Sequence, residues 1–66
     1  MSEITYTVPD LSCEHCEQAV RSELSRVPGV ASVEVELGTK LVTVRGRALE
    51  DAALRAAIEE AGYEAA

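Results

Sequence analysis

The chain has 66 residues and a formal net charge of −6, from twelve acidic and six basic side chains. Its Val, Leu and Ile residues suffice for one small core, which excludes a second domain or a deep substrate cavity. The acidic balance, together with Tyr6 and Tyr63 as the only aromatic residues, disfavours nucleic-acid binding, which needs a basic surface and usually aromatic stacking platforms.

Alternating side chains predict a first strand over residues 4–8, where apolar residues alternate with threonines. Pro9 ends this strand, because proline has no backbone N–H to donate to a neighbouring strand. A helix is predicted over residues 14–26, since apolar residues recur along one helical face and Ser12 is placed to act as the N-cap. The Pro-Gly pair at residues 28–29 ends the helix.

The second half of the chain predicts a β-hairpin followed by a helix. Apolar and polar side chains alternate over residues 32–45, on both sides of a turn at residues 38–39. An apolar stripe then predicts a helix over residues 49–61, with Gly62 at the C′ position, where a left-handed backbone is common. Residues 63–66 leave room only for a short last strand.

The predicted order of elements is therefore β-α-β-β-α-β. This is the order of the ferredoxin-like sandwich, in which a four-stranded antiparallel sheet carries both helices on one face. We expect a single α+β domain over residues 1–66. The last strand has the weakest sequence pattern of all the elements.

The sequence carries no sign of export or membrane insertion. It has no run of eighteen apolar residues, which a membrane span would need. The start of the chain contains Glu3 and Asp10 but no basic residue before an apolar stretch, unlike a secretory signal. We therefore expect a complete, small cytoplasmic protein that begins at Met1. A module of a longer protein is the alternative.

One group of residues carries chemistry: Cys13 and Cys16, three positions apart where a loop becomes the first helix. Free N–H groups and the positive end of the helix dipole stabilise a thiolate there and lower the thiol pKa. Structural zinc needs four ligands, and the chain has no second cysteine pair. Cu(I) prefers thiolates and accepts as few as two. Such a site has open flanks, so an incoming third thiolate could take the metal away.

Other interpretations of the cysteine pair remain open at this point. A Cys-x-x-Cys pair is also typical of small dithiol redox proteins, although thioredoxin-like proteins are longer and usually carry aromatic and proline residues around it. Alternatively, Cys16 simply packs in the core as an inert residue. Attachment of a c-type haem is excluded, because Glu17 rather than histidine follows the second cysteine.

Three segments together resemble the heavy-metal-associated domain: VPDLSCEHC at residues 8–16, VPGV at residues 27–30 and AGY at residues 61–63. The chain looks most like bacterial copper chaperones and the N-terminal domains of copper-exporting P-type ATPases. The resemblance covers essentially the whole chain and implies the same fold. It also implies that Cys13 and Cys16 bind Cu(I), and often other soft ions such as Ag(I), Zn(II) or Cd(II).

The resemblance implies an auxiliary role for Tyr63, whose ring would shield the thiolates or whose hydroxyl would bond to a sulfur. The alternative is an ordinary half-buried aromatic residue of the sheet. His15 lies inside the motif and is either an auxiliary ligand, in a zinc complex or a copper-bridged dimer, or a plain exposed side chain on the first helical turn. Its charge would change near neutral pH, which allows a pH-dependent metal release.

Two positions depart from the family pattern, because Asp10 and Leu11 stand where family members commonly carry Gly-Met. Leu11 keeps an apolar anchor that can insert into the core beneath the loop. Asp10 and Glu14 add negative charge, which should raise the thiol pKa slightly and oppose the helix dipole. Carboxylate and imidazole groups also suit Zn(II) better than Cu(I).

We therefore predict a cytosolic copper(I)-binding protein of chaperone type, and no enzyme, because no catalytic constellation can be assembled. Cys13 and Cys16 would pass the metal by ligand exchange to the matching domain or entry site of a copper-exporting P-type ATPase, or to a copper-sensing regulator. The acidic surface predicts a basic docking face on the partner and binding that weakens with salt. The alternatives are a Zn(II), Cd(II) or Hg(II) binding domain of the same fold, a dithiol redox protein, and a copper-bridged homodimer.

Overall fold

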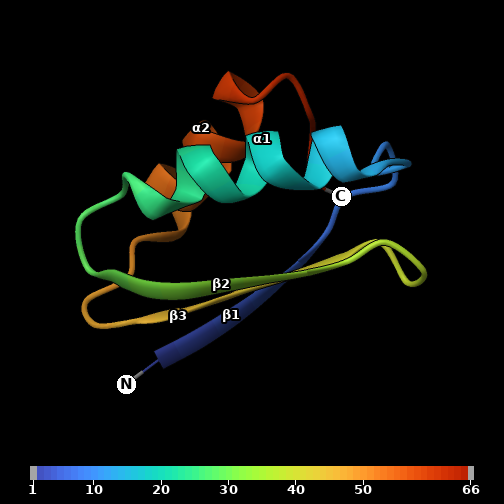
Figure 1. The fold of residues 1–66 in the computed structure, drawn as a ribbon. Coiled ribbons are helices and arrows are strands. Elements are labelled where there is room, and N and C mark those ends of the chain that lie inside the picture. Colours follow the sequence, from blue (N-terminus) through green and yellow to red (C-terminus); the bar gives the residue numbers. More distant parts are fainter. Residues whose placement is uncertain (1, 66) are drawn as a thin grey trace.

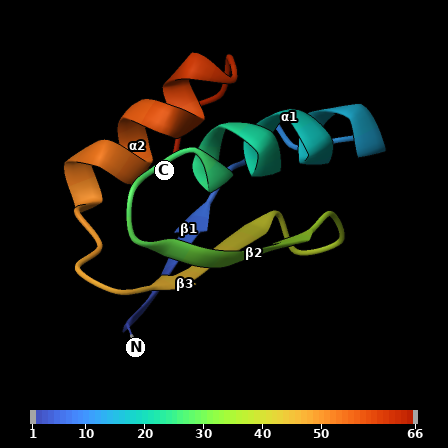
Figure 2. The same ribbon diagram turned by 60° about the vertical axis from the view of Figure 1, so that its left-hand side comes forward.

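Two helices lie on one face of an antiparallel sheet in the structure of this protein, a computed structural model that describes residues 2–65 (Figure 1). The view turned by 60° shows the same two layers, with both helices on the same side of the strands (Figure 2). In chain order the elements are β1 (Ser2–Thr7), α1 (Glu14–Ser25), β2 (Val30–Glu36), β3 (Leu41–Gly46) and α2 (Asp51–Glu60).

The three strands pair in the order β1-β3-β2, with β3 in the centre and both pairings antiparallel. Strand β3 shows why one face is covered: Val42 and Val44 are fully buried, while Thr43 between them is only half-buried. The period-2 pattern of the sequence therefore predicted the strands correctly. Within residues 2–65, neither helix is long and apolar enough to cross a membrane.

The fourth strand expected at the end of the chain is not formed among the described residues, so this part of the prediction was wrong. Residues 63–65 have no regular structure, and residue 66 lies outside the described range. The cause is the end of α2. Gly62 adopts φ 93°, as its C′ position predicted, and the N–H of Tyr63 bonds back to the carbonyl of Ile58 at 3.1 Å. The helix end thus uses the first donor that a last strand would need.

The helix boundaries differ slightly from the prediction. α1 begins one residue later than a Ser12 cap implies, because Cys13 is the N-cap, with φ −155° and ψ 170° and no side-chain capping bond. It ends at Ser25 rather than at residue 26, and α2 covers a shorter range than the predicted residues 49–61. The shift at the start of α1 places one cysteine at the cap and the other in the first turn.

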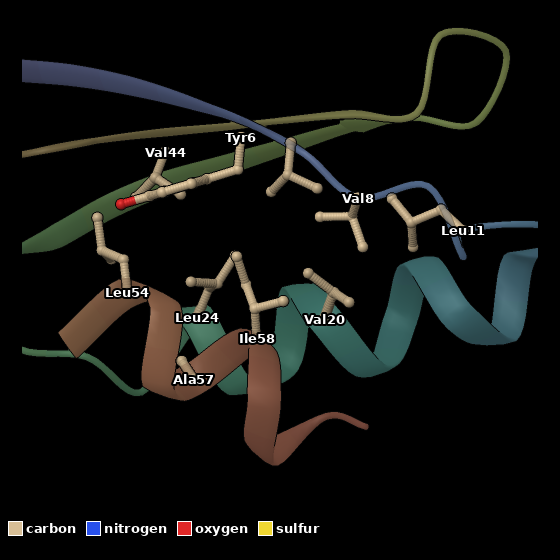
Figure 3. Close-up of a cluster of buried hydrophobic side chains, with 10 residues drawn as sticks. Tyr6, Val8, Leu11, Val20, Leu24, Val44, Leu54, Ala57 and Ile58 are labelled. Atoms are coloured by element: carbon tan, nitrogen blue, oxygen red, sulfur yellow. The ribbon is translucent and has the colours of Figure 1, made fainter. Parts of the chain in front are cut away.

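The core lies between the helices and the sheet (Figure 3). Leu11 is fully buried beneath the loop before α1, which confirms the apolar anchor predicted at this position. No buried residue that the structure describes is polar or charged, and the buried hydrophobic residues are Tyr6, Val8, Leu11, Val20, Leu24, Val42, Val44, Leu54, Ala57 and Ile58.

Tyr6 joins β1 to α2 through its polar end. Its side chain is buried, and its hydroxyl donates a hydrogen bond of 2.7 Å to Oδ1 of Asp51. Arg55 donates to the other carboxylate oxygen at 3.0 Å, and its guanidinium carbon lies 5.4 Å from the centre of the Tyr6 ring. Burial, followed by the bond to Asp51, raises the pKa of Tyr6 to about 12. The bond from Tyr6, followed by Arg55, lowers the pKa of Asp51.

At the end of the sheet that is remote from the cysteines, two backbone segments approach each other closely. The N–H of Arg47 donates to the carbonyl of Gly29 at 2.8 Å. A Cβ atom on Gly46 would collide with the carbonyl oxygen of Gly29, and a Cβ atom on Gly29 would collide with that of Arg47. Gly29 also has φ 93°, in the left-handed region. This close approach requires both glycines.

Candidate metal site

The loop between β1 and α1 ends in Cys13 and leads into the helical turn that carries Cys16, at one end of the sandwich (Figure 1). Its base is fixed by Val8 and Leu11, whose side chains are fully buried and whose backbones are joined by a bond of 3.1 Å from the N–H of Leu11 to the carbonyl of Val8. The carbonyl of Cys13 accepts the N–H of Glu17 at 3.1 Å, the first bond of α1. A buried anchor and a helix start thus hold the exposed residues between them.

The two sulfur atoms lie side by side. Sγ of Cys13 is 3.2 Å from Sγ of Cys16, and both cysteines are free thiols. A disulfide would need about 2.05 Å, so the pair is in hydrogen-bond contact rather than bonded. Cys13 is exposed, whereas Cys16 is half-buried and packs against the core. One sulfur therefore faces solvent and the other is held by the fold.

The environment of Cys16 favours its thiolate. A hydrogen bond from the hydroxyl of Tyr63, then one from Cys13 and one from the backbone of Ser12, lower the pKa of Cys16 to about 6. The sequence predicted a lowered thiol pKa from the helix N-terminus alone. The structure adds specific donors to that cause, and these outweigh the burial that opposes it. These donors therefore favour the thiolate form of Cys16.

Tyr63 reaches the cysteine pair from the opposite end of the chain. It follows the glycine that ends α2, and its side chain is half-buried. The bond to Cys16, followed by burial and then by the negative charge of the thiolates and Asp10, raises the pKa of Tyr63. Its hydroxyl therefore stays protonated and remains a donor to the sulfur. The structure brings together three of the residues singled out from the sequence; a role of Tyr63 in metal binding stays a prediction.

His15 does not join this group. Its side chain is exposed on the first turn of α1, as is that of Glu14, and Asp10 is exposed in the preceding loop. Within residues 2–65, no three side chains of the types His, Cys, Asp and Glu converge on a point where they could hold a metal ion. The arrangement thus offers two thiolate ligands, open to solvent on the Cys13 side. An auxiliary role for His15 stays a prediction.

Sequence reasoning missed one residue at this end of the molecule. Lys40, in the turn between β2 and β3, donates a hydrogen bond from its ammonium group to the backbone carbonyl of Leu11. Lys40 is the single lysine of the chain and is half-buried in a turn. A single lysine in a turn was the one feature of the sequence that could have drawn attention to this residue. Nothing in the spacing of the sequence indicates that the turn lies against the loop.

Comparison with known proteins agrees with this geometry. The model of the family described as "Heavy-metal-associated domain" matches residues 5–64. The copper chaperone CopZ of Staphylococcus epidermidis is 38% identical over 66 residues, which cover 97% of each chain. A structure described as "CopZ metallochaperone" superposes with a TM-score of 0.93 at 33% identity, covering 98% of this chain and 100% of that one.

Two longer proteins contain a segment similar to this chain. Heavy metal-associated isoprenylated plant protein 31 of Arabidopsis thaliana is 43% identical over 58 residues, which are 88% of this chain but 41% of the plant protein. A copper-exporting P-type ATPase of Mycobacterium tuberculosis is 36% identical over 63 residues, which are 94% of this chain and 8% of the ATPase. The same small unit therefore occurs both alone and as part of larger proteins.

Proposed function

The chain belongs to the heavy-metal-associated domain family, and on that premise we propose that it binds one Cu(I) ion between Cys13 and Cys16 and passes it to a copper-transporting ATPase. The observation that carries this proposal is the pair of free sulfurs 3.2 Å apart at the start of α1, with Cys13 exposed. The similarity to CopZ over nearly the whole of both chains supports the choice of copper.

The number of ligands favours Cu(I) over Zn(II). Zinc in protein sites is almost always held by at least three protein ligands, and a structural zinc by four. Within residues 2–65 the cysteine pair gains no third His, Cys, Asp or Glu ligand. A soft monovalent ion satisfied by thiolates fits this donor set better. The complex of two thiolates and Cu(I) carries one net negative charge.

Capture of the metal needs a small movement of one sulfur. Two thiolates on opposite sides of one metal ion would stand further apart than thiols in hydrogen-bond contact, whose sulfurs lie 3.2 Å apart in the structure. Cys13 is the residue free to move, because it is exposed and lies at the helix N-cap without a side-chain capping bond. Cys16, whose thiolate form the surrounding donors favour, is the first ligand, and Cys13 closes on the metal as it releases its proton.

Release of the metal depends on the same difference between the exposed Cys13 and the half-buried Cys16. A thiolate of the partner approaches from the open side of Cys13 and forms a third bond to the metal. The bond to Cys13 then breaks, its sulfur takes up a proton from solvent, and the metal shifts to a second thiolate of the partner as Cys16 lets go. No electron is transferred, and the charge of the complex travels with the metal. We place this exchange in the cytoplasm, where thiols remain reduced.

The partner we propose is an ATPase that carries a domain of this same family. The support is that the copper-exporting ATPase of M. tuberculosis contains a segment similar to nearly all of this chain. The net charge of −6 favours a basic docking face on that domain and an association that weakens with salt. Transfer to a copper-sensing regulator and a copper-bridged homodimer are further outcomes that the exposed site allows.

Titration of the reduced protein with Cu(I), in competition with a Cu(I) chelator of known affinity, tests the proposal. We expect one Cu(I) per chain and loss of binding in Cys13→Ser and in Cys16→Ser. His15→Ala is the matched control inside the motif and should bind normally. No binding stronger than that of the chelator would contradict the proposal. Zn(II) competition and an insulin-reduction assay measure the two alternatives, and efficient disulfide reduction would favour the redox protein.

A further inference from the structure

Lys40 is bonded to the cysteine loop through both its side chain and its backbone. Its ammonium group donates to the carbonyl of Leu11, while its own carbonyl accepts the N–H of Val8 at 2.9 Å. Among residues 2–65 it forms no ion pair, although the chain carries twice as many acidic as basic side chains. The only lysine of an acidic protein is thus directed at a backbone carbonyl.

These two bonds clamp both ends of the segment of residues 8–11. Between them the N–H of Leu11 bonds to the carbonyl of Val8 at 3.1 Å, so the segment is a closed turn. Figure 3 shows the hairpin turn lying over this segment, with the side chains of Val8 and Leu11 directed into the core on the other side. Cys13 follows only two residues after the carbonyl that Lys40 binds.

The backbone of Lys40 is unfavourable for lysine. Its φ of 63° lies in the left-handed region, which glycine and asparagine adopt more readily than other residues. The turn by itself would therefore be better served by either of those residues. A long cationic side chain at a strained position is explained by what the ammonium group contacts rather than by the turn.

We propose that Lys40 is a positioning residue of the metal site, which ties the loop that carries Cys13 to the hairpin turn and keeps the loop in its binding-competent shape. This inference rests on the proposed function. The apparent affinity for a ligand falls with the fraction of the protein that is competent to bind it. Loss of the clamp would let the loop leave the arrangement in which the two sulfurs meet.

The test variant is Lys40→Asn, which removes the ammonium group and suits the left-handed backbone. We expect its Cu(I) affinity, measured against a competing chelator, to fall about tenfold, the size of one charge-assisted hydrogen bond. Its midpoint of urea unfolding should stay unchanged or rise, because asparagine relieves the strain. If Lys40 served only the turn, the Cu(I) affinity of Lys40→Asn would equal that of the wild type, whatever happened to the midpoint of urea unfolding.

Two variants control for charge and chemistry. Lys40→Arg keeps a cationic donor and should bind Cu(I) within about twofold of the wild type. Arg47→Gln removes one positive charge at the opposite end of β3, and it should also stay within about twofold. Should Lys40→Asn fail to fold, Lys40→Gly carries the same comparison, because glycine adopts this φ without strain.

Hydrogen exchange of the metal-free protein separates failure of this inference from failure of the proposed function. In Lys40→Asn the amides of residues 11–16 should exchange faster, while those of β3 stay as protected as in the wild type. Unchanged loop exchange, or wild-type Cu(I) affinity in Lys40→Asn, overturns the clamp. A wild-type protein that does not bind Cu(I) overturns the proposed function instead, and faster loop exchange would still support the clamp.

Discussion

The two ends of this small sandwich are built differently. At the metal end, the loop of residues 9–13 is exposed apart from the buried Leu11, and one of its backbone carbonyls accepts a hydrogen bond from the distant side chain of Lys40. At the closed end, the backbones at Gly29 and Gly46 approach so closely that neither position has space for a Cβ atom. The difference indicates that the closed end provides stability, whereas the metal end stays accessible for ligand exchange.

Replacement of the cysteines tests the metal end with the largest expected effect. Cys13→Ser and Cys16→Ser should each lower Cu(I) affinity far more than the roughly 100-fold cost of losing an outer contact of a metal site. The free energy of unfolding of the metal-free protein should change by about 0.5 kcal/mol or less for the exposed Cys13. Chelator competition and urea unfolding of the same samples measure both quantities.

A loss of stability as large as the loss of affinity would show that the metal end also holds the fold together. In that case the contrast between the two ends would be wrong.

Gly46→Ala tests the closed end and should show the reverse pattern. The added Cβ atom would collide with the carbonyl oxygen of Gly29, and we expect a loss of about 2–3 kcal/mol in stability. For a domain of this size such a loss lowers the melting temperature by roughly 10–20 °C. The folded fraction should still bind one Cu(I) per chain. Thermal unfolding monitored by circular dichroism provides the measurement.

Gly38→Ala is the matched control for this substitution. A Cβ atom on Gly38 has no neighbour within 4 Å, and the residue is not in the left-handed region. The variant should melt close to the wild type. Equal melting temperatures for Gly38→Ala and Gly46→Ala would remove the basis for calling one end closed.

Tyr63→Phe refines the description of the metal end. The hydroxyl of Tyr63 is the first cause of the lowered pKa of Cys16, which stands at about 6, so its removal should raise that pKa by about one unit. The rate of alkylation by iodoacetamide as a function of pH, with each cysteine studied in the Ser variant of the other, measures the change. A titration of Cys16 identical in the two proteins would exclude the hydrogen bond as the cause.

Tyr6→Phe is the mildest change and acts through pH. The pKa of Tyr6 is raised to about 12 by burial and by its bond to Asp51, whereas an unfolded chain has a value of about 10. The neutral tyrosine therefore contributes stability that is fully present below pH 10 and is lost as the pH rises toward 12. The phenylalanine variant should lack this alkaline loss and bind Cu(I) normally. Urea unfolding of both proteins at a series of pH values measures this difference in alkaline stability.

The sequence predicted the local features of the fold because these depend on neighbouring residues. Alternation of side chains identified the three observed strands, and helical periodicity identified both helices within one to two residues at each end. The predicted fourth strand was wrong, because the end of α2 was treated as a simple stop. The bond from Tyr63 back to Ile58 depends on the geometry of the helix end rather than on a pattern of apolar residues.

The sequence identified those features of the candidate site that depend on residues close together in the chain. Two cysteines at a helix start are sufficient to predict a reactive thiolate pair, and family resemblance pointed to Tyr63. The contact of Lys40 with Leu11 joins residues 29 positions apart and leaves no signature in spacing. For His15 the sequence had offered an exposed side chain on the first helical turn as one of two interpretations, and the structure places it there.

The sequence by itself thus determined the elements, the acidic charge and the place of Cys13 and Cys16 at the start of a helix, since each follows from residues close together in the chain. Only the tertiary structure decided which sulfur is exposed and which is half-buried, because the groups around the two cysteines come from distant parts of the chain. Cys16 receives its donor from the residue after the end of α2, and the loop of Cys13 is tied to the hairpin turn. Contacts of this kind form only when the sandwich closes and brings the far parts of the chain to one end.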